Sequence, residues 1–273
     1  MRVVVTRPAG DAQAWVDALK AAGHDALALP LIEVGPATHR QPVEQAWEQW
    51  AEFQAVMFVS AQAVRYFFDS QPAAMRADAG HAASLTWTHG PRCWATGPGT
   101  LKALLQAGVP EACIDSPAAD ATQFDSEALW QRVSTLVQAG KPVLIVRGKD
   151  VNDPVTGGGA PNGTGRDWLA QQLQAAGTPA QFVVAYERRA PVWSAVQQAQ
   201  AVQAAADGSV WCFSSSQAIH NLAHGLPNQS WVKARCIATH PRIAQTAQAL
   251  GFGEIQMSKP SLADLLVSLE SLA

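Results

Sequence analysis

Short runs of β-branched and apolar residues alternate along the chain with segments that place apolar residues at helical spacing. In residues 11–22, for example, Trp15, Leu19 and Ala22 fall on one helix face. Strands that alternate with helices predict an α/β fold with parallel sheets, because helices make the crossover connections. The predicted strands cover residues 2–6, 26–30, 55–59, 92–96, 142–146, 181–185, 210–214, 234–239 and 254–257, and further helices are predicted at 166–176 and 261–272.

The two halves of the chain share three short blocks that occur in the same order. Each match is short, but three in order indicate an internal duplication. About five strands in each half then predict two doubly wound, flavodoxin-like lobes with parallel sheets. Two facing lobes would form a ligand-binding cleft between them. The paired blocks are 19–23 with 173–177, 60–64 with 215–219, and 93–98 with 236–241.

Two extended segments are predicted to cross between the lobes as a two-stranded linker. They follow the second strand of each repeat, at residues 32–37 and 185–191, and the repeat aligns Ile32 with Tyr186. A phenol in such a crossing could point toward a ligand and supply a hydrogen bond or a proton. The alternative is an ordinary strand tyrosine with a hydrated hydroxyl.

Composition and charge narrow the class of protein. The 273 residues are 48% hydrophobic and carry a formal net charge of −3, with 19 Lys and Arg residues spread along the chain. A nucleic-acid-binding protein normally shows a basic stripe, so this class is disfavoured. The sequence has no long apolar run and its N-terminus is quickly polar, so we expect a soluble, cytoplasmic protein without a membrane span or a signal peptide. The four cysteines form no C-x-x-C pair and are predicted to be reduced.

Small hydroxylic residues, glycines and arginines follow the predicted strands, where ligands bind in doubly wound folds. Small side chains let backbone N–H groups approach a ligand, helix N-termini favour anions, and arginine adds charge-assisted hydrogen bonds. The pattern predicts a ligand with several carboxylates or phosphates; the alternative is that the serines and threonines only cap helices. The candidate binding residues are Thr6, Arg7, Ser60, Ala61, Thr96, Gly97, Gly99, Thr100, Arg147, Gly148, Ser214, Ser215, Ser216, Thr239, His240 and Arg242.

Two other motifs give weaker signals. Residues 157–165 form a glycine-rich stretch, but it lacks the Lys-Ser/Thr pair of a phosphate loop. A flexible insertion is therefore favoured over a nucleotide-dependent transferase. His220 and His224 are one helical turn apart, yet no cysteine or carboxylate is placed to complete a zinc site, and we expect no metal.

Seven motifs, taken in order, resemble those of the uroporphyrinogen-III synthase family. They lie at residues 5–10, 29–33, 58–64, 95–100, 143–148, 213–216 and 238–244 and so cover nearly the whole chain. The resemblance implies two α/β lobes joined by a two-stranded linker, with one lobe built from both chain ends. The expected lobes are residues 1–34 plus 188–273, and residues 38–184.

The resemblance also implies a reaction, the cyclisation of hydroxymethylbilane to uroporphyrinogen III in heme biosynthesis. Ring D is inverted and water is lost, which makes the enzyme a hydro-lyase. The implied substrate carries eight carboxylates, and the implied enzyme is a monomer that needs no metal or organic cofactor and no partner besides this small molecule. Tyr186 matches the tyrosine favoured as proton donor in the family. Binding or helper roles carry over to Ser60, Thr96, Thr100, Ser215 and Thr239.

The sequence departs from the family pattern at two places. Residues 149–163 are longer and richer in glycine and asparagine than expected, as in a lid or an unstructured insertion. His240 stands where the repeat would place a glycine equivalent to Gly97. The alternative function is therefore a non-catalytic, two-lobe binding or sensory module for a polyanionic tetrapyrrole.

Overall fold

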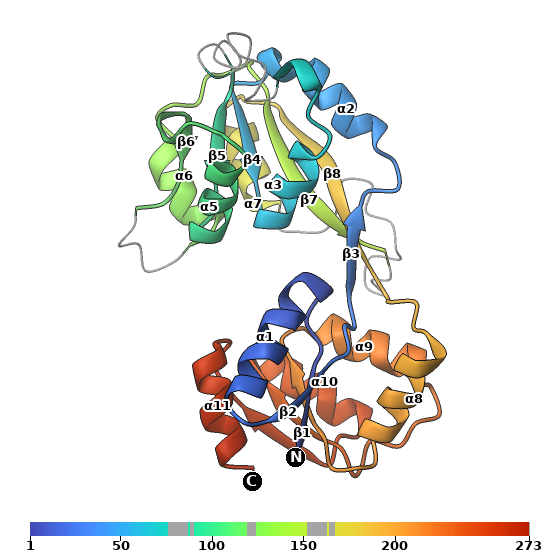
Figure 1. Ribbon diagram of the computed structural model, residues 1–273. Coiled ribbons are helices and arrows are strands. Elements are labelled where there is room, and N and C mark those ends of the chain that lie inside the picture. Colours follow the sequence, from blue (N-terminus) through green and yellow to red (C-terminus); the bar gives the residue numbers. More distant parts are fainter. Residues whose placement is uncertain (76–86, 88–89, 119–123, 152–162, 164–166, 273) are drawn as a thin grey trace. The chain divides into compact units, whose positions relative to one another are not determined.

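The computed structural model describes residues 1–75, 87, 90–118, 124–151, 163 and 167–272 (Figure 1). The chain folds into two compact units, which we describe separately. The terminal lobe comprises Met1–Val34 and Arg189–Ala273, and the central lobe comprises Gly35–Arg188. Within the described residues, no helix is long and apolar enough to cross a membrane.

The terminal lobe is built on a five-stranded sheet with the order β11-β10-β9-β1-β2. All its strand pairs are parallel. The strands are β1 (Arg2–Val5), β2 (Asp25–Ala28), β9 (Val210–Phe213), β10 (Arg235–Ala238) and β11 (Glu254–Met257). The helices are α1 (Ala9–Ala21), α8 (Ala195–Ala204), α9 (Ser216–Gly225), α10 (Pro241–Leu250) and α11 (Leu262–Glu270).

Both faces of this sheet are covered, because successive strand residues point to opposite sides. Val3 and Val5 pack with α1 and α11 on one face. Val4 and Trp211 pack with α8, α9 and α10 on the other. This double burial explains why residues 3–5 of β1 and all of β9 are apolar instead of alternating with polar residues.

The central lobe contains a six-stranded sheet with the order β3-β8-β7-β4-β5-β6. Helices α6 and α7 cover one face of it, and an aromatic cluster around Trp47 and Phe67 packs against Phe58 on the other. The strands are β3 (Glu33–Pro36), β4 (Ala55–Phe58), β5 (Arg92–Ala95), β6 (Ile114–Asp115), β7 (Val143–Asp150) and β8 (Ala180–Arg189). The helices are α2 (Gln41–Glu48), α3 (Ala61–Phe68), α5 (Pro98–Gln106), α6 (Ser126–Val133) and α7 (Trp168–Ala175), with short 3₁₀ turns at Trp50–Glu52, Ala73–Met75 and Glu111–Cys113.

Apart from the additional edge strand β3 of the central lobe, the two sheets share one topology, which confirms the predicted doubly wound α/β class. In the terminal lobe, β1-α1-β2 from the first half of the chain joins β9, β10 and β11 from the second half. In the central lobe, β7-α7-β8 from the second half joins β4, β5 and β6 from the first. Each lobe therefore combines the opening β-α-β unit of one repeat with the closing strands of the other.

Some element boundaries differ from those expected. Strands β7 and β8 continue beyond the predicted ends at residues 146 and 185, because they pair with each other through Asp150 and Arg188. Helix α1 begins at Ala9, two residues earlier than predicted, so Asp11 lies in its first turn. The extension of β8 carries Tyr186, which is expected in the extended linker segment 185–191, into pairing with β7.

Two glycine substitutions test the packing of the terminal lobe. A Cβ atom at Gly253 would overlap the backbone carbonyl of Val232, whereas nothing lies within 4 Å of a Cβ at Gly10 on α1. We expect Gly253→Ala to lower the free energy of unfolding by about 1–3 kcal/mol and Gly10→Ala to raise it by about 0.5 kcal/mol. Urea unfolding of both variants checks this, and equal stabilities would contradict the packing described.

Candidate functional site

Some of the predicted polar residues lie at the carboxyl edge of the central sheet and cap the helices that begin there. Ser60 precedes α3, and its Oγ accepts a hydrogen bond from the Ala63 N–H at 3.1 Å. The Thr96 hydroxyl donates to the Val59 carbonyl at 3.4 Å, and Thr100 is buried in the first turn of α5. Capping therefore uses one acceptor position of Ser60 and leaves its hydroxyl proton for another partner.

That partner is Tyr186 on β8. The two hydroxyl oxygens lie 3.2 Å apart, and either can donate. The Tyr186 side chain is only 4% exposed, and its ring is stacked on that of Tyr66 from α3, with centroids 6.0 Å apart and an interplanar angle of 23°. The fold thus brings together two predicted site residues that are 126 positions apart in the sequence.

A register shift in the sheet places the Tyr186 ring. Arg147 pairs with Val184, but the next residue, Gly148, pairs with Tyr186, so Ala185 is an extra residue in β8. Its carbonyl accepts a hydrogen bond from the Ala37 N–H at 3.2 Å. Such bulges re-aim side chains, and this one sets Tyr186 directly opposite Gly148.

Gly148 is necessary for this arrangement. A Cβ atom there would overlap the Tyr186 ring, and even the ring atom Cε1 would be only 2.8 Å away. The Arg188 guanidinium lies 5.7 Å from the centroid of the same ring and 3.0 Å from an Asp150 carboxylate oxygen. Glycine at 148 therefore serves close packing of the tyrosine, in addition to the open backbone that the sequence suggested.

The burial and the contacts of Arg147 differ from those expected of a ligand-binding arginine. It is 3% exposed, donates to the Asp167 carboxylate at 2.8 Å, and stacks over the Phe182 ring at 4.1 Å. Together with Thr96 it lines a hollow that also contains Asp125 and Glu127. The charge of Arg147 is already neutralised by a carboxylate, which favours a structural role.

Some of the predicted polar residues at the edge of the terminal sheet cap helices, and others line a hollow. Thr6 is buried and donates to the Cys212 carbonyl at 2.6 Å. Ser215 Oγ accepts from the Gln217 N–H at 3.2 Å, and His240 Nδ1 accepts from the Arg242 N–H at 3.1 Å. His240 therefore caps α10 with its side chain, which the glycine at the equivalent position of α5, Gly97, cannot do.

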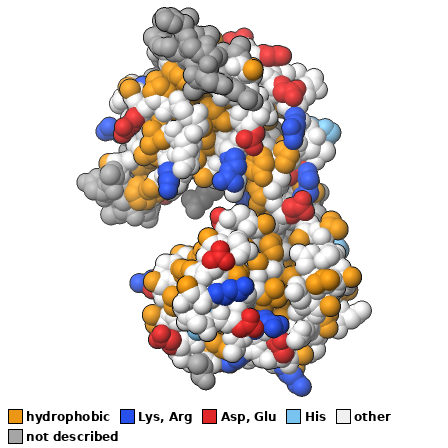
Figure 2. Space-filling view, viewed as in Figure 1, with side chains coloured by type: hydrophobic (Ala, Val, Ile, Leu, Met, Phe, Trp, Pro, Cys, Tyr) orange, Lys and Arg blue, Asp and Glu red, His pale blue; other side chains and the backbone are white. Residues whose placement is uncertain are grey.

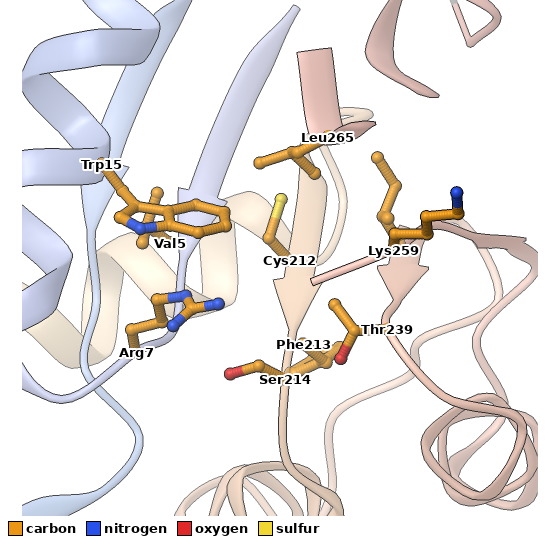
Figure 3. A pocket seen from close by; sticks show the side chains of 10 residues that line it. Val5, Arg7, Trp15, Cys212, Phe213, Ser214, Thr239, Lys259 and Leu265 are labelled. Atoms are coloured by element: carbon orange, nitrogen blue, oxygen red, sulfur yellow. The ribbon is translucent and has the colours of Figure 1, made fainter. Parts of the chain in front are cut away.

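The remaining predicted residues lie near these caps. Arg7, Ser214 and Thr239 line the hollow shown in Figure 3. Ala61 and Gly99 lie in the first turns of α3 and α5, and Ser216 and Arg242 in those of α9 and α10. Of the unusual segment 149–163, residues 152–162 lie outside the described residues, as does most of the glycine-rich stretch 157–165.

The face of the protein shown in Figure 2 carries charges of both signs. In Figure 2, lysine and arginine side chains are scattered among acidic ones on the visible face. His220 and His224 both lie on α9, and the described residues contain no group of three or more histidines, cysteines, aspartates or glutamates that could hold a metal ion.

Comparison with known proteins decides the family. The model of the family described as uroporphyrinogen-III synthase HemD matches residues 13–267. The chain belongs to this family. In this member of the uroporphyrinogen-III synthase family, the Tyr186–Ser60 pair brings two hydroxyl groups within hydrogen-bond distance in the central lobe. A comparison with curated protein sequences gives no significant match.

Two solved structures support the fold assigned to this family member. A uroporphyrinogen-III synthetase from Helicobacter pylori is 16% identical, with a TM-score of 0.53, and the match covers 100% of both chains. A mutant uroporphyrinogen III synthase from Thermus thermophilus is 12% identical, with a TM-score of 0.52, and the match covers 100% of this chain and 98% of that one. At these identities the likeness establishes the fold alone.

Sequence reasoning missed two members of the Tyr186 cluster. No motif in the sequence points to Tyr66 or Arg188. Tyr66 lies six positions after Ser60 on α3, and only the folded structure brings this helix beside β7 and the Tyr66 ring onto Tyr186. Both residues lie near Tyr186 only because segments distant in the sequence pack together in the folded lobe.

A double-mutant cycle tests the packing of Tyr186 on Gly148. Gly148→Ala should lower the free energy of unfolding by about 1–3 kcal/mol because the new methyl group meets ring carbons. Tyr186→Phe should not relieve this loss, since it keeps the ring, whereas Tyr186→Leu should. Urea unfolding of the single and double variants measures the coupling. Strict additivity in the Gly148→Ala/Tyr186→Leu double variant would contradict the packing, and Gly35→Ala, where nothing lies within 4 Å, is the control.

Proposed function

We propose that this protein is an active uroporphyrinogen-III synthase, a hydro-lyase that cyclises hydroxymethylbilane to uroporphyrinogen III with inversion of ring D. The proposal rests on family membership over residues 13–267 and on one observation, the hydrogen bond of 3.2 Å between the Tyr186 and Ser60 hydroxyls. We further propose that it acts as a cytoplasmic monomer without a metal or an organic cofactor.

The first chemical step needs a proton. The hydroxyl of the hydroxymethyl group leaves as water once its oxygen is protonated, and its methylene carbon stays on the ring. The ring becomes an electrophilic azafulvenium ion, which is an azafulvene once its N–H proton is lost. Tyr186 is the proposed proton donor. Because its side chain is 4% exposed and Ser60 is partly exposed, the shortest path to a substrate at the sheet edge runs through the Ser60 hydroxyl. Such an acid contributes roughly 10²–10⁴-fold to the rate.

The second step determines the isomer. The substituted carbon of ring D attacks the azafulvene carbon and forms a spiro-pyrrolenine, which opens and closes again with ring D inverted. The free carbon of ring D would give the other isomer without enzyme, so the protein must hold the chain folded. Positioning of reacting groups can supply up to about 7–11 kcal/mol of the barrier reduction.

Positioning falls to the polar edges of the two sheets. The substrate's carboxylates match groups that donate hydrogen bonds, and helix N-termini favour anions without a strongly basic surface. Nothing lies within 4 Å of the position of a Cβ atom at Gly99, so a ligand can approach the backbone at the start of α5, and the small side chain of Ala61 would serve the same purpose at the start of α3. The proposed binding set is Thr6, Arg7, Ser60, Ala61, Thr96, Gly97, Gly99, Thr100, Gly148, Ser214, Ser215, Ser216, Thr239, His240 and Arg242, with a structural role favoured for Arg147.

The product isomer tests the proposal. Purified protein given hydroxymethylbilane should form mainly the type III isomer, and chromatography separates the isomers after oxidation. Exclusive type I product, as in a control without enzyme, would contradict the proposal. Binding of the tetrapyrrole without turnover would instead favour the non-catalytic binding module.

Removal of the phenol tests the proton donor. Tyr186→Phe keeps the ring and its packing, so kcat should fall by roughly 10²–10⁴-fold with little change in stability. Thr178→Val is the matched control: it deletes a buried hydroxyl that donates to the Gln138 carbonyl at 3.1 Å, near the start of β8. A kcat for Tyr186→Phe equal to that of the control would rule out the phenol as the acid.

A further inference from the structure

The two tyrosines of this chain lie against each other in the central lobe. The sequence contains only Tyr66 and Tyr186, and the fold stacks their rings with centroids 6.0 Å apart and planes inclined by 23°. This geometry is typical of an offset-stacked aromatic pair, which stabilises more than its buried area alone. The proposed chemistry uses the phenol of Tyr186 and leaves the neighbouring ring of Tyr66 unexplained.

One helix, α3, contacts the Tyr186 side chain at two places. Ser60 caps this helix, and its hydroxyl lies 3.2 Å from the Tyr186 hydroxyl. Tyr66, in the second turn, supplies the stacked ring. The helix lies against β7 (Figure 1) and is fixed there by buried side chains such as Val64 and Phe67. The hydroxyl partner and the ring partner of Tyr186 are therefore held at a constant spacing by one rigid element.

The other neighbours of the Tyr186 ring restrain it less with respect to Ser60. Gly148 presents only backbone to the ring, because a Cβ atom there would lie 2.3 Å from Cζ of Tyr186. Arg188 lies 5.7 Å from the ring centroid, but it belongs to the same strand, β8, and so moves together with Tyr186. Among the aromatic pairs of the described residues, Tyr186 takes part only in the pair with Tyr66.

We infer that Tyr66 is a positioning residue for the proton donor: its ring holds the Tyr186 ring in the orientation in which the phenol meets Ser60. This inference rests on the proposed function of Tyr186 as the acid. Tyr66 acts through its ring face and does not touch the reacting atoms. A buried phenol that turns away from Ser60 loses its path to the substrate, so the stack sets the fraction of molecules that can donate the proton.

Two substitutions of Tyr66 separate its ring from its hydroxyl. Loss of one aromatic pair shifts the balance between two ring orientations by about 2- to 12-fold. Tyr66→Leu should therefore lower kcat by this factor and leave KM nearly unchanged. Tyr66→Phe keeps the ring and should stay close to the parent protein. Steady-state kinetics with hydroxymethylbilane measure both constants, and equal kcat values for the two variants would overturn the role of the ring.

Phe68→Leu is the matched control. It also replaces an aromatic ring of α3 by leucine, but the Phe68 ring packs against Trp47, with centroids 5.4 Å apart. We expect Phe68→Leu to keep the kcat of the parent protein. A loss of kcat equal to that in Tyr66→Leu would mean that any loosening of α3 lowers turnover, and that result would overturn the inference.

A double variant separates positioning from structural damage. Tyr186→Phe has no phenol for Tyr66 to orient, so adding Tyr66→Leu should leave its residual kcat unchanged. Residues that act as a unit show this non-additivity, whereas independent structural damage lowers the rate by the same factor in either background. An equal loss of kcat from Tyr66→Leu with and without the Tyr186 hydroxyl would contradict the positioning role.

Fluorine NMR follows the orientation of the ring without relying on turnover. Because the chain has only two tyrosines, growth on 3,5-difluorotyrosine labels positions 66 and 186 alone, and the Tyr66 variants carry the label only at Tyr186. A ring held in one orientation gives separate signals for its two fluorines, and these signals merge when the ring flips rapidly. At a pH at which the phenol is protonated, they should merge at a lower temperature in Tyr66→Leu than in Tyr66→Phe or Phe68→Leu. Equal merging temperatures would overturn the inference.

The kinetic and NMR results together distinguish failure of this inference from failure of the proposed function. If the parent protein forms no type III isomer but the Tyr186 signals merge at a lower temperature in Tyr66→Leu, Tyr66 orients the ring and the proposed function fails. If the parent is active and Tyr66→Leu matches Tyr66→Phe in both kcat and merging temperature, only the role of Tyr66 is wrong.

Discussion

The insertion of Ala185 into the pairing of β7 with β8 is the constraint on which the proposed chemistry depends. Without this extra residue, Gly148 would face Ala185, and Tyr186 would point to the other side of the sheet, because a shift of one residue reverses the direction of every side chain in a strand. With it, the phenol lies over Gly148 and reaches Ser60. A β-bulge thus links strand register to the placement of one hydroxyl.

The fold supplies the partners for that hydroxyl from distant parts of the chain. Ser60 and Tyr66 come from the turn and helix after β4, whereas Gly148 and Tyr186 come from the opening β-α-β unit of the second repeat. The cluster exists because the repeats exchange these units between lobes, so that β7 lies beside β4 in one sheet. In the terminal lobe the same exchange sets Arg7, from the first repeat, beside Cys212 and Thr239 from the second.

Sequence patterns predicted the architecture well, because its causes are local. The apolar residues 3–5 of β1 and the fully apolar strand β9 indicate burial on both faces, and the alternation of strands with helices indicates parallel pairing. The fold class and the family are confirmed. The site was less predictable. The positions of hydroxyl groups directly after strands indicated Ser60 and Thr239, but they did not indicate which of these residues cap helices. The positions of Tyr66 and Arg188 depend on tertiary packing, and the Asp167 partner that neutralises Arg147 was not visible in the sequence.

The most direct measurement of the central claim varies the acidity of the Tyr186 phenol while keeping its ring. Tyrosines with increasing numbers of ring fluorines are incorporated at position 186 alone, and kcat is measured at a pH at which every phenol is protonated. If Tyr186 donates the proton that releases water, log kcat rises steadily as the phenol becomes more acidic. A kcat that is independent of phenol acidity across the series would contradict the account.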